Sequence, residues 1–263
     1  MNSDIIWSYK VKKTLIQIIS VIVVFLLWKG YVTVFGVSKF VLPPPEEVLH
    51  ALVRLMQRND TYLHIYTTLV ECLGGFTIAV ILGTIIGQLL GRFELLDTIF
   101  KPMVIALQLT PKVALIPLFI LWFGFGIESK IIISALLAFF PVFSNSYLGA
   151  KSVDKGLVEV FQVGKSKPWQ RFKLLIIPSS LPYILTGMEM AIVLAIIGAV
   201  VSEFVAGSKG LGYLATIKLQ DLEVDTLFAV VILLALIGFV LYFTVGSIRR
   251  FAIPWHESAQ KSK

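Results

Sequence analysis

The chain has 263 residues, a net charge of +7 and 57% hydrophobic residues, while only 15% of its residues are charged. Soluble proteins average about 45–50% apolar and about 25% charged residues, so this composition excludes an ordinary soluble domain and indicates an integral membrane protein. The surplus of Lys and Arg is typical of loops that face anionic lipid, so we expect no nucleic-acid partner. One cysteine excludes an internal disulfide and a cysteine-rich metal site.

Six hydrophobic segments meet the length of about 20 mostly apolar residues that a bilayer requires. The expected fold is therefore an all-α membrane protein with about six transmembrane helices. The predicted spans are residues 14–35, 65–91, 102–123, 130–150, 180–206 and 226–248. An even number places both termini on one side of the membrane. With the termini in the cytoplasm, 16 of the 23 Lys and Arg residues lie on the cytoplasmic side, which sets the expected orientation.

The first span follows several lysines, as in a secretory signal peptide, but no small-x-small cleavage site comes after it. We therefore interpret it as a retained span. The connection at 36–60 contains PPPEE, which predicts an extended entry into a short amphipathic helix along the membrane surface. The expected division is an N-terminal span with its extracytoplasmic segment (1–60), a transmembrane domain (61–248) and a basic cytoplasmic tail (249–263).

Small residues and prolines mark the middle spans. Gly83, Gly87 and Gly91 repeat every four residues, a spacing that lets helix backbones approach closely. We expect this stripe to serve internal packing, with a subunit interface as the alternative. Pro111 and Pro141 each remove a backbone donor from a predicted span and kink it. Broken helices often border a cavity in the membrane, although kinked packing would explain them equally well.

Three carboxylates fall within predicted spans, namely Glu71, Glu189 and Glu203. Ionisable side chains are costly in a membrane and usually face a cavity or a partner. Glu189 and Glu203 share one helix, within about 40° around its axis and about 21 Å apart along it. We expect them to line one translocation path together with Glu71. The alternative is an interfacial Glu203 and a locally paired Glu71, whereas Glu189 has no basic neighbour in its span.

The longest predicted cytoplasmic connection, 151–173, reads KSVDKGLVEVFQVGKSKPWQRFK. Asp154 predicts a helix start, Gly164 a helix stop and Pro168 the start of a second short helix. An apolar stripe follows the spacing i, i+3, i+4, i+7. Its members are Leu157, Val160, Phe161 and Gly164. An exposed stripe of this kind fits a groove on a partner protein, and the alternative is a loop folded onto its own span ends.

The same connection contains Gly164-Lys165-Ser166, the end of a nucleotide-binding P-loop pattern. Glu159 occupies the position of the first glycine of that pattern, and no buried strand precedes it. Another glycine-rich segment, GLGYLA at 210–215, fits the spacing of a dinucleotide-binding turn but directly follows a predicted span. Neither segment fits a nucleotide site, so we expect this chain to bind no nucleotide.

Five stretches together resemble the permease subunit of binding-protein-dependent ABC importers, in the branch that serves sulfonates, taurine, nitrate and some vitamin precursors. They are VLPPPEEV at 41–48, ALIPLFILWFGFG at 114–126, the segment 156–189, VSEFVAGSKGLGYL at 201–214 and RRFAIPW at 249–255. The resemblance covers most of the chain and implies the fold of a type I importer permease.

The resemblance also implies that the 151–173 connection binds an ATPase subunit. In the family, a glutamate and an alanine pair precede a glycine, and a proline closes the motif. Glu159 stands at the glutamate and Trp169 at a common aromatic position. Phe161 replaces a small alanine, and the glycine comes one position early, so that Lys165 occupies its place. The docking loop thus implied comprises Asp154, Leu157, Glu159, Val160, Phe161, Gly164, Lys165 and Trp169.

The implied assembly contains two permease copies, expected to be identical, in a bacterial inner membrane. Two ATPase subunits bind ATP and Mg²⁺, so this chain is expected to be no enzyme and to hold no cofactor. A soluble binding protein delivers the substrate to the outer face. Glu189 replaces a residue that is basic in most of the family, which suggests a path that accepts more than simple anions.

Two other functions remain as alternatives. A proton-coupled secondary transporter would use Glu189 and Glu203 as proton carriers, although six spans without a repeat are few for that class. An ABC exporter subunit is the nearer alternative. A membrane enzyme has no supporting serine–histidine pair, metal cluster or carboxylate pair in the sequence. The sequence does not single out the transported substrate.

Overall fold

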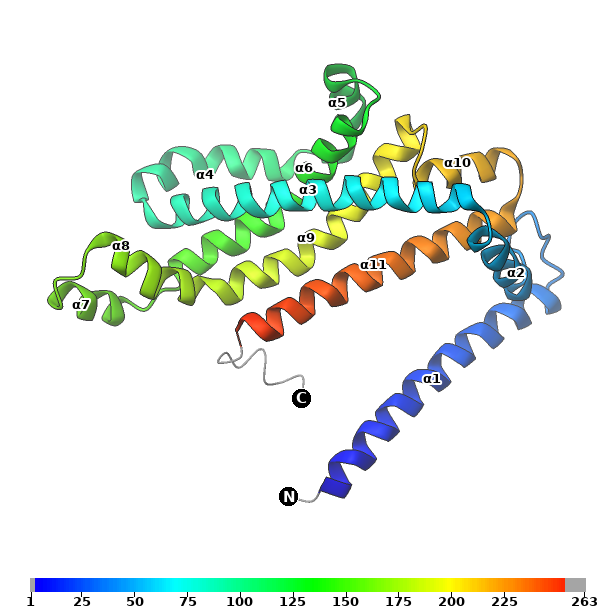
Figure 1. Ribbon diagram of the computed structural model, residues 1–263, viewed down its shortest axis with the longest axis horizontal. Helices are drawn as coiled ribbons and strands as arrows, with labels where there is room; N and C mark the ends of the chain where they lie inside the picture. Colours follow the sequence, from blue (N-terminus) through cyan, green and yellow to red (C-terminus); the bar gives the residue numbers. More distant parts are fainter. Residues whose placement is uncertain (1–2, 254–263) are drawn as a thin grey trace. The chain divides into compact units, whose positions relative to one another are not determined.

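The computed structural model describes residues 3–253, and the regular secondary structure of this part of the chain is all helical, with no strand (Figure 1). The α-helices are α1 (Ser3–Val34), α2 (Pro45–Met56), α3 (Asn59–Arg92), α4 (Glu94–Leu109), α5 (Ile116–Phe123), α6 (Ile127–Lys151), α7 (Lys155–Val163), α8 (Pro168–Arg171), α9 (Ile177–Ala206), α10 (Leu211–Gln220) and α11 (Val224–Ala252). A 3₁₀ turn, Lys112–Leu115, precedes α5, and a π-helical turn, Phe172–Ile176, joins α8 to α9.

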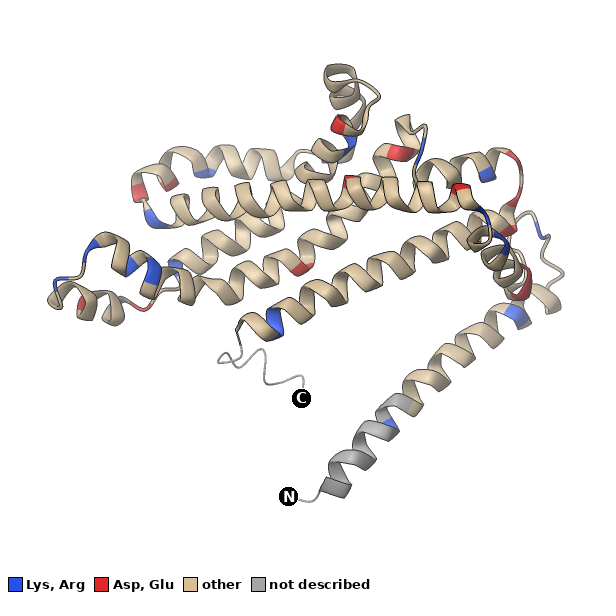
Figure 2. Ribbon diagram, viewed as in Figure 1, with Lys and Arg blue, Asp and Glu red and all other residues tan. Residues whose placement is uncertain are grey.

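Five helical segments are long and apolar enough to cross a membrane, and they match the first, second, fourth, fifth and sixth predicted spans. In Figure 2 the charged residues gather mainly near the helix ends, while the middle of each long helix is largely uncharged. The helices extend beyond the predicted limits. In particular, the tail predicted at 249–263 begins inside the last turn of α11, and its residues 254–263 lie outside the described part of the chain.

The third predicted span, 102–123, is wrong as a continuous helix. The chain instead forms α4 and then a separate segment, Lys112–Phe123, bent by 84° from α4. The break falls at Thr110 and Pro111, which both have extended backbone angles. Pro111 cannot donate a backbone hydrogen bond, and it disfavours a helical conformation at the residue before it. Pro141, in contrast, is accommodated inside α6.

The chain forms two compact units, which we describe separately. The first unit contains residues 1–59 and 215–233. Its helix α2 confirms the amphipathic helix expected after the PPPEE run, with Pro45 at its first position. The α2 face formed by Val48, Ala51 and Leu55 is buried. Ion pairs connect Lys29 with Glu46, Lys39 with Glu47, and Arg54 with Asp225.

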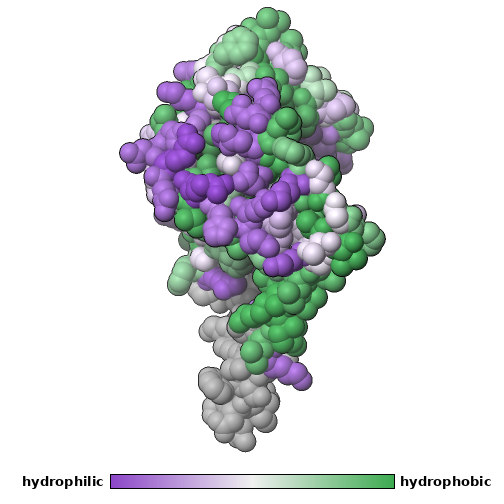
Figure 3. Space-filling view, turned by 90° about the vertical axis from the view of Figure 1, so that its right-hand side faces the viewer, coloured by the Kyte–Doolittle hydropathy of each residue, from purple (hydrophilic) through white to green (hydrophobic). Residues whose placement is uncertain are grey.

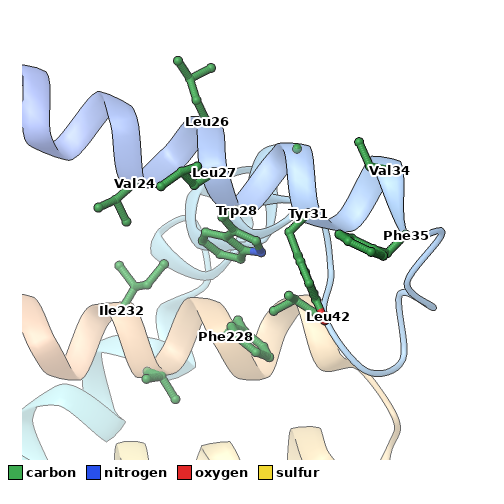
Figure 4. Close-up of a pocket in the computed structure, with 12 residues that line it drawn as sticks. Val24, Leu26, Leu27, Trp28, Tyr31, Val34, Phe35, Leu42, Phe228 and Ile232 are labelled. Atoms are coloured by element: carbon green, nitrogen blue, oxygen red, sulfur yellow. The ribbon is translucent and has the colours of Figure 1, made fainter.

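An apolar groove of about 860 Å³ lies in the first unit between α1 and the start of α11 (Figure 4). Trp28 of α1 lies over Phe228 of α11, with ring centroids 6.2 Å apart, and Tyr31 and Leu42 close one end of the groove. Residues 15–27 of α1 are exposed, and the part drawn in colour in Figure 3 is largely hydrophobic. A surface of this kind requires lipid or another protein chain to cover it.

The second unit contains residues 60–214 and 234–263, and its core lies between α3, α6, α9 and the C-terminal part of α11. The glycine stripe of α3 packs directly against α6. A side chain at Gly83 would meet Val142, one at Gly87 would meet Phe143 and Ser146, and one at Gly91 would meet Ala150. The prediction that this stripe serves internal packing is therefore confirmed.

Replacement of Gly87 by alanine is expected to lower the thermal stability of the protein. A methyl group there would lie 2.6 Å from the Phe143 carbonyl oxygen and 2.9 Å from the Tyr147 backbone nitrogen. The backbones of α3 and α6 would have to move apart to make room for the methyl group. Overpacking of this kind costs about 1–3 kcal/mol. The matched control is Gly238→Ala in α11, where the nearest atom is 3.8 Å away. Equal melting temperatures for the two variants in detergent would contradict this packing.

Candidate functional site

Two of the three carboxylates predicted for the path lie together with a lysine inside the second unit. Glu71 of α3 is 0% exposed, Glu203 of α9 is 1% exposed and Lys130 of α6 is 4% exposed. The Lys130 Nζ atom lies 3.6 Å from Glu71 Oε1. Lys130 occupies the first turn of α6, and its side chain is buried. The pairing favours the interpretation in which Glu71 has a local partner.

The carboxylate of Glu203 also fixes the turn that leads into α10. It accepts hydrogen bonds from the Thr68 hydroxyl at 2.6 Å and from the Gly212 backbone N–H at 2.5 Å. The two amides before Gly212 have partners on α3, because Leu211 donates to Thr68 Oγ1 at 2.8 Å and Gly210 donates to His64 Nδ1 at 3.0 Å. Three successive donors at a helix start, which lack intrahelical partners, are thereby satisfied.

Only glycine fits at position 210 of this turn. Gly210 has a φ of +104°, a conformation that other residues rarely adopt. A Cβ atom there would also collide with the Glu203 carboxylate. The glycine-rich segment at 210–215, which fits no nucleotide site, therefore has a role in packing.

The third carboxylate, Glu189, lies elsewhere on α9 and is buried beside α11. Its Oε2 atom lies 2.9 Å from Arg249 Nη1, and both side chains are largely enclosed. The sequence shows no basic residue within the span of Glu189, and Arg249 falls just beyond residue 248, where the last span was expected to end. Glu189 therefore has a basic partner, which comes from another helix.

All three carboxylates belong to buried residues, and a part in the translocation path stays a prediction for each of them. Their partners come from α3, α6, α9 and α11, so the ionic contacts join four helices. Among the residues that the structure describes, no group of three or more His, Cys, Asp or Glu side chains could hold a metal ion.

The 151–173 connection forms the predicted helix, turn and second helix. Asp154 caps α7 by accepting hydrogen bonds from the backbone N–H groups of Gly156 at 2.6 Å and Leu157 at 3.3 Å. Helix α7 ends at Val163, and α8 begins at Pro168. The Gln170 side chain accepts a hydrogen bond from the Lys167 backbone N–H at 2.8 Å, which stabilises the start of α8.

The apolar stripe predicted for this connection divides between two sides of α7. Val160 and Val163 are 65% and 85% exposed, and Leu157, Glu159 and Trp169 are also exposed. Phe161 is half-buried and turns towards the rest of the chain. The pattern missed Val163, although its position three residues after Val160 puts it on the same helix face. A surface of α7 and α8 therefore presents Glu159, Val160, Val163 and Trp169.

The turn between α7 and α8 places Lys165 in a left-handed conformation, with a φ of +49°, while Gly164 has a φ of −71°. A non-glycine residue in this region costs about 1–2 kcal/mol. Ser166 offsets part of this cost, since its backbone N–H and its hydroxyl both donate to the Phe161 carbonyl, at 3.0 and 2.6 Å. Lys165 thus has the backbone conformation that favours glycine at the position where the resemblance expects one.

A cavity lies at the break between α4 and α5, as one of the two interpretations of Pro111 and Pro141 predicted. Its volume is about 600 Å³, and α4, the 3₁₀ turn, α6 and α9 all contribute to its wall. The polar and aromatic lining includes Thr110, Lys112, Phe140, Ser144 and Asn145. Pro111 and Pro141 both belong to the lining, and they were the signals in the sequence that indicated a cavity here.

Comparison with known proteins decides the family. Residues 79–254 match the family described as "Binding-protein-dependent transport system inner membrane component". The chain belongs to this family. It is thus a multi-pass inner-membrane permease subunit of an ABC importer of the binding-protein-dependent type, which confirms the family and fold expected from the sequence.

Several curated permeases are similar over almost their whole length. The permease is 30% identical to the formylaminopyrimidine transport permease protein ThiX of Halalkalibacterium halodurans, over 88% of this chain and 92% of that one. It is 33% identical to the riboflavin transport system permease protein RibX of Chloroflexus aurantiacus, over 91% and 90%. It is also 33% identical to SsuC of Bacillus subtilis, a putative aliphatic sulfonates transport permease, over 90% and 86%.

Solved structures show the same fold. A chain of the inward-facing MetNI methionine ABC transporter superposes on the permease with a TM-score of 0.63. The superposition covers 72% of this chain and 95% of that chain, at 16% sequence identity. At this identity the match supports the fold alone.

The variant Glu203→Gln is expected to loosen the turn before α10. A glutamine presents one acceptor oxygen where the carboxylate presents two, so either Thr68 or Gly212 loses its partner. An unsatisfied buried donor costs about 1–3 kcal/mol. Hydrogen exchange at the amides of residues 210–212 should become faster than in Glu94→Gln, an exposed control on α4. Unchanged exchange would contradict the hydrogen-bonding role of Glu203.

The variant Arg249→Gln is expected to destabilise the permease by about 3–5 kcal/mol, since it leaves the buried Glu189 carboxylate without its ionic partner. The double variant Glu189→Gln/Arg249→Gln should recover much of this loss, because two neutral amides remain. Melting temperatures of the single and double variants in detergent measure the coupling. Strictly additive effects would show that the two side chains do not interact.

Proposed function

We propose that this permease works as one of two identical copies that enclose a solute path, driven by two copies of a separate ATPase subunit. The observation that carries the proposal is the exposed apolar surface of α7 and α8, formed by Val160, Val163 and Trp169. It lies on a short, well-capped helical connection and offers a rigid surface to a groove on a partner. The family of the chain supports an ATPase and a binding protein as partners in general.

The proposed orientation places both termini and the 151–173 connection in the cytoplasm. The excess of Lys and Arg in the corresponding connections supports it. Lys165, Lys167 and Lys173 are all exposed on this connection, as expected for a segment on the cytoplasmic side. ATP and Mg²⁺ would then bind the partner ATPase, and this chain would supply no catalytic group and hold no cofactor.

The opposite face would receive the substrate from a soluble binding protein, near residues 36–60 and 207–222. Relatives of the permease are named for the transport of formylaminopyrimidine, riboflavin and aliphatic sulfonates. We extend to this chain only what these compounds share, namely a small polar organic solute. ATP-driven closure of the ATPases would move α7 and α8 and thereby switch the access of the path between the two sides.

The variant Val160→Asp should abolish most ATPase binding while the permease stays folded. It places a charge in the centre of the exposed surface, where a desolvated partner groove would oppose it. The amount of ATPase that copurifies with the tagged permease from its native membrane, identified by mass spectrometry, should fall at least about tenfold, or ~1.4 kcal/mol. This substitution is a sharper test than one at Phe161, because the Phe161 side chain is half-buried and its replacement would also disturb packing.

The matched control is Gln162→Asp, which introduces the same charge on α7 at an exposed position beside the apolar surface. It should retain ATPase binding and ATP-dependent uptake in vesicles. Equal binding by both variants would show that the docking surface lies elsewhere. A permease that purifies without any ATPase, and that moves solute with a proton gradient and no ATP, would overturn the proposed function.

A further inference from the structure

The cavity at the break between α4 and α5 has the size and lining of a small-molecule site. Its volume of about 600 Å³ falls in the range of about 300–1,000 Å³ that such sites occupy. Pro111 interrupts the helix there, and the segment Lys112–Phe123 leaves α4 at 84°. Broken helices at membrane depth are tolerated where they line a cavity, and transporters often place their solute sites at them.

Lys112 is the charged group in the wall of this cavity. It is half-buried, and its Nζ atom donates to the Gln108 carbonyl oxygen at 3.0 Å. The same ammonium lies 4.3 Å from the centroid of the Phe140 ring. Within residues 3–253, no carboxylate lies within ion-pair distance of it. Lys130 and Arg249, in contrast, each have a glutamate partner.

An ammonium group in an apolar segment without an anion is costly, so such groups usually serve a ligand or a pathway. A carbonyl and an aromatic face satisfy Lys112 only in part, because an ammonium has three donors. The residues lining the cavity include no Asp or Glu. The charge balance of the wall therefore favours a negatively charged occupant.

We infer that this cavity is the solute site of the path, and that Lys112 binds the anionic oxygen group of a small organic anion. The inference deepens the proposed function and rests on it. The Ser144 hydroxyl makes no hydrogen bond to any described residue and is available to the solute. Asn145 uses its amide N–H to bind the Pro141 carbonyl, which leaves its own carbonyl oxygen as an acceptor. Phe140 and Met190 provide apolar contacts for the rest of the solute.

The pairing of Glu189 with Arg249 supports this charge assignment. Glu189 precedes Met190 of the cavity wall in the sequence, and an unpaired carboxylate there would repel an anion. The Glu189 carboxylate is instead paired with Arg249 of α11, with 2.9 Å between Glu189 Oε2 and Arg249 Nη1. The wall therefore combines one available cation with neutral polar groups.

The test uses Ser144→Cys in the full-length permease in membrane vesicles, labelled with methanethiosulfonate reagents of opposite charge. The probes are the anionic sulfonatoethyl reagent, the cationic trimethylammonioethyl reagent and the neutral methyl reagent. Each rate is divided by the rate of that reagent with a free thiol. The native Cys72 is buried and should not react. Both charged reagents react with the thiolate form of the introduced cysteine. The ratio of their two reaction rates therefore does not depend on the fraction of this cysteine that is ionised.

The anionic reagent should be favoured at Ser144→Cys, and the additional change Lys112→Gln should lower the rate ratio by about five- to tenfold. Lys173→Gln, which removes the same charge from an exposed position outside the cavity, should leave the ratio unchanged. Asn145→Cys provides another reporter position in the same wall. A ratio that Lys112→Gln does not change, or cysteines that even the neutral reagent cannot reach, would overturn the inference.

The labelling needs no ATPase and no binding protein, so its failure is distinguishable from failure of the proposed function. If an ATPase copurifies but Lys112→Gln does not change the ratio of anionic to cationic labelling rates, the anion site alone is rejected. If Lys112→Gln lowers the ratio as expected but no ATPase binds the permease, the proposed coupling to an ATPase alone is rejected.

Discussion

The constraint on which this structure depends is that a bilayer offers no water to polar groups within the membrane. Each such group must find its partner in the chain or in an assembly. Lys130 pairs with Glu71, Glu203 accepts hydrogen bonds from Thr68 and from the Gly212 amide, and Arg249 pairs with Glu189. These contacts connect α3, α6, α9 and α11, and each pair is needed because one partner alone would be an uncompensated charge.

Close packing of small residues allows these polar contacts to form. The glycines of α3 let its backbone approach α6, and Ala191, Ala195 and Ala199 bring α9 into the same core. The Ser134 hydroxyl of α6 is 2.8 Å from the Ala195 carbonyl oxygen, a distance that larger residues between the helices would not permit. Association of membrane helices depends on such packing and interhelical hydrogen bonds, since lipid tails remove the hydrophobic driving force between helices.

Features that depend on local sequence could be predicted, and those that depend on tertiary pairing could not. The lengths of the apolar segments correctly predicted five of the six spans. Residues that favour helix ends correctly predicted the short helices α2, α7 and α8. The bend at Pro111 was expected only as a kink, because a proline is tolerated or breaks a helix according to its surroundings, as Pro141 in α6 shows. The partners of Glu71 and Glu189 lie far away in the sequence, so no spacing rule could identify them.

Lys165 adopts the left-handed conformation of the turn after α7, with Ser166 supplying the hydrogen bonds that hold it there. A search pattern that demands glycine at this point would pass over chains built like this one. Lysine followed by serine can produce the same backbone path, although at a higher conformational cost. The turn is therefore better defined by its backbone geometry than by one residue type. Relatives that lack the glycine can still form the same turn between the two helices.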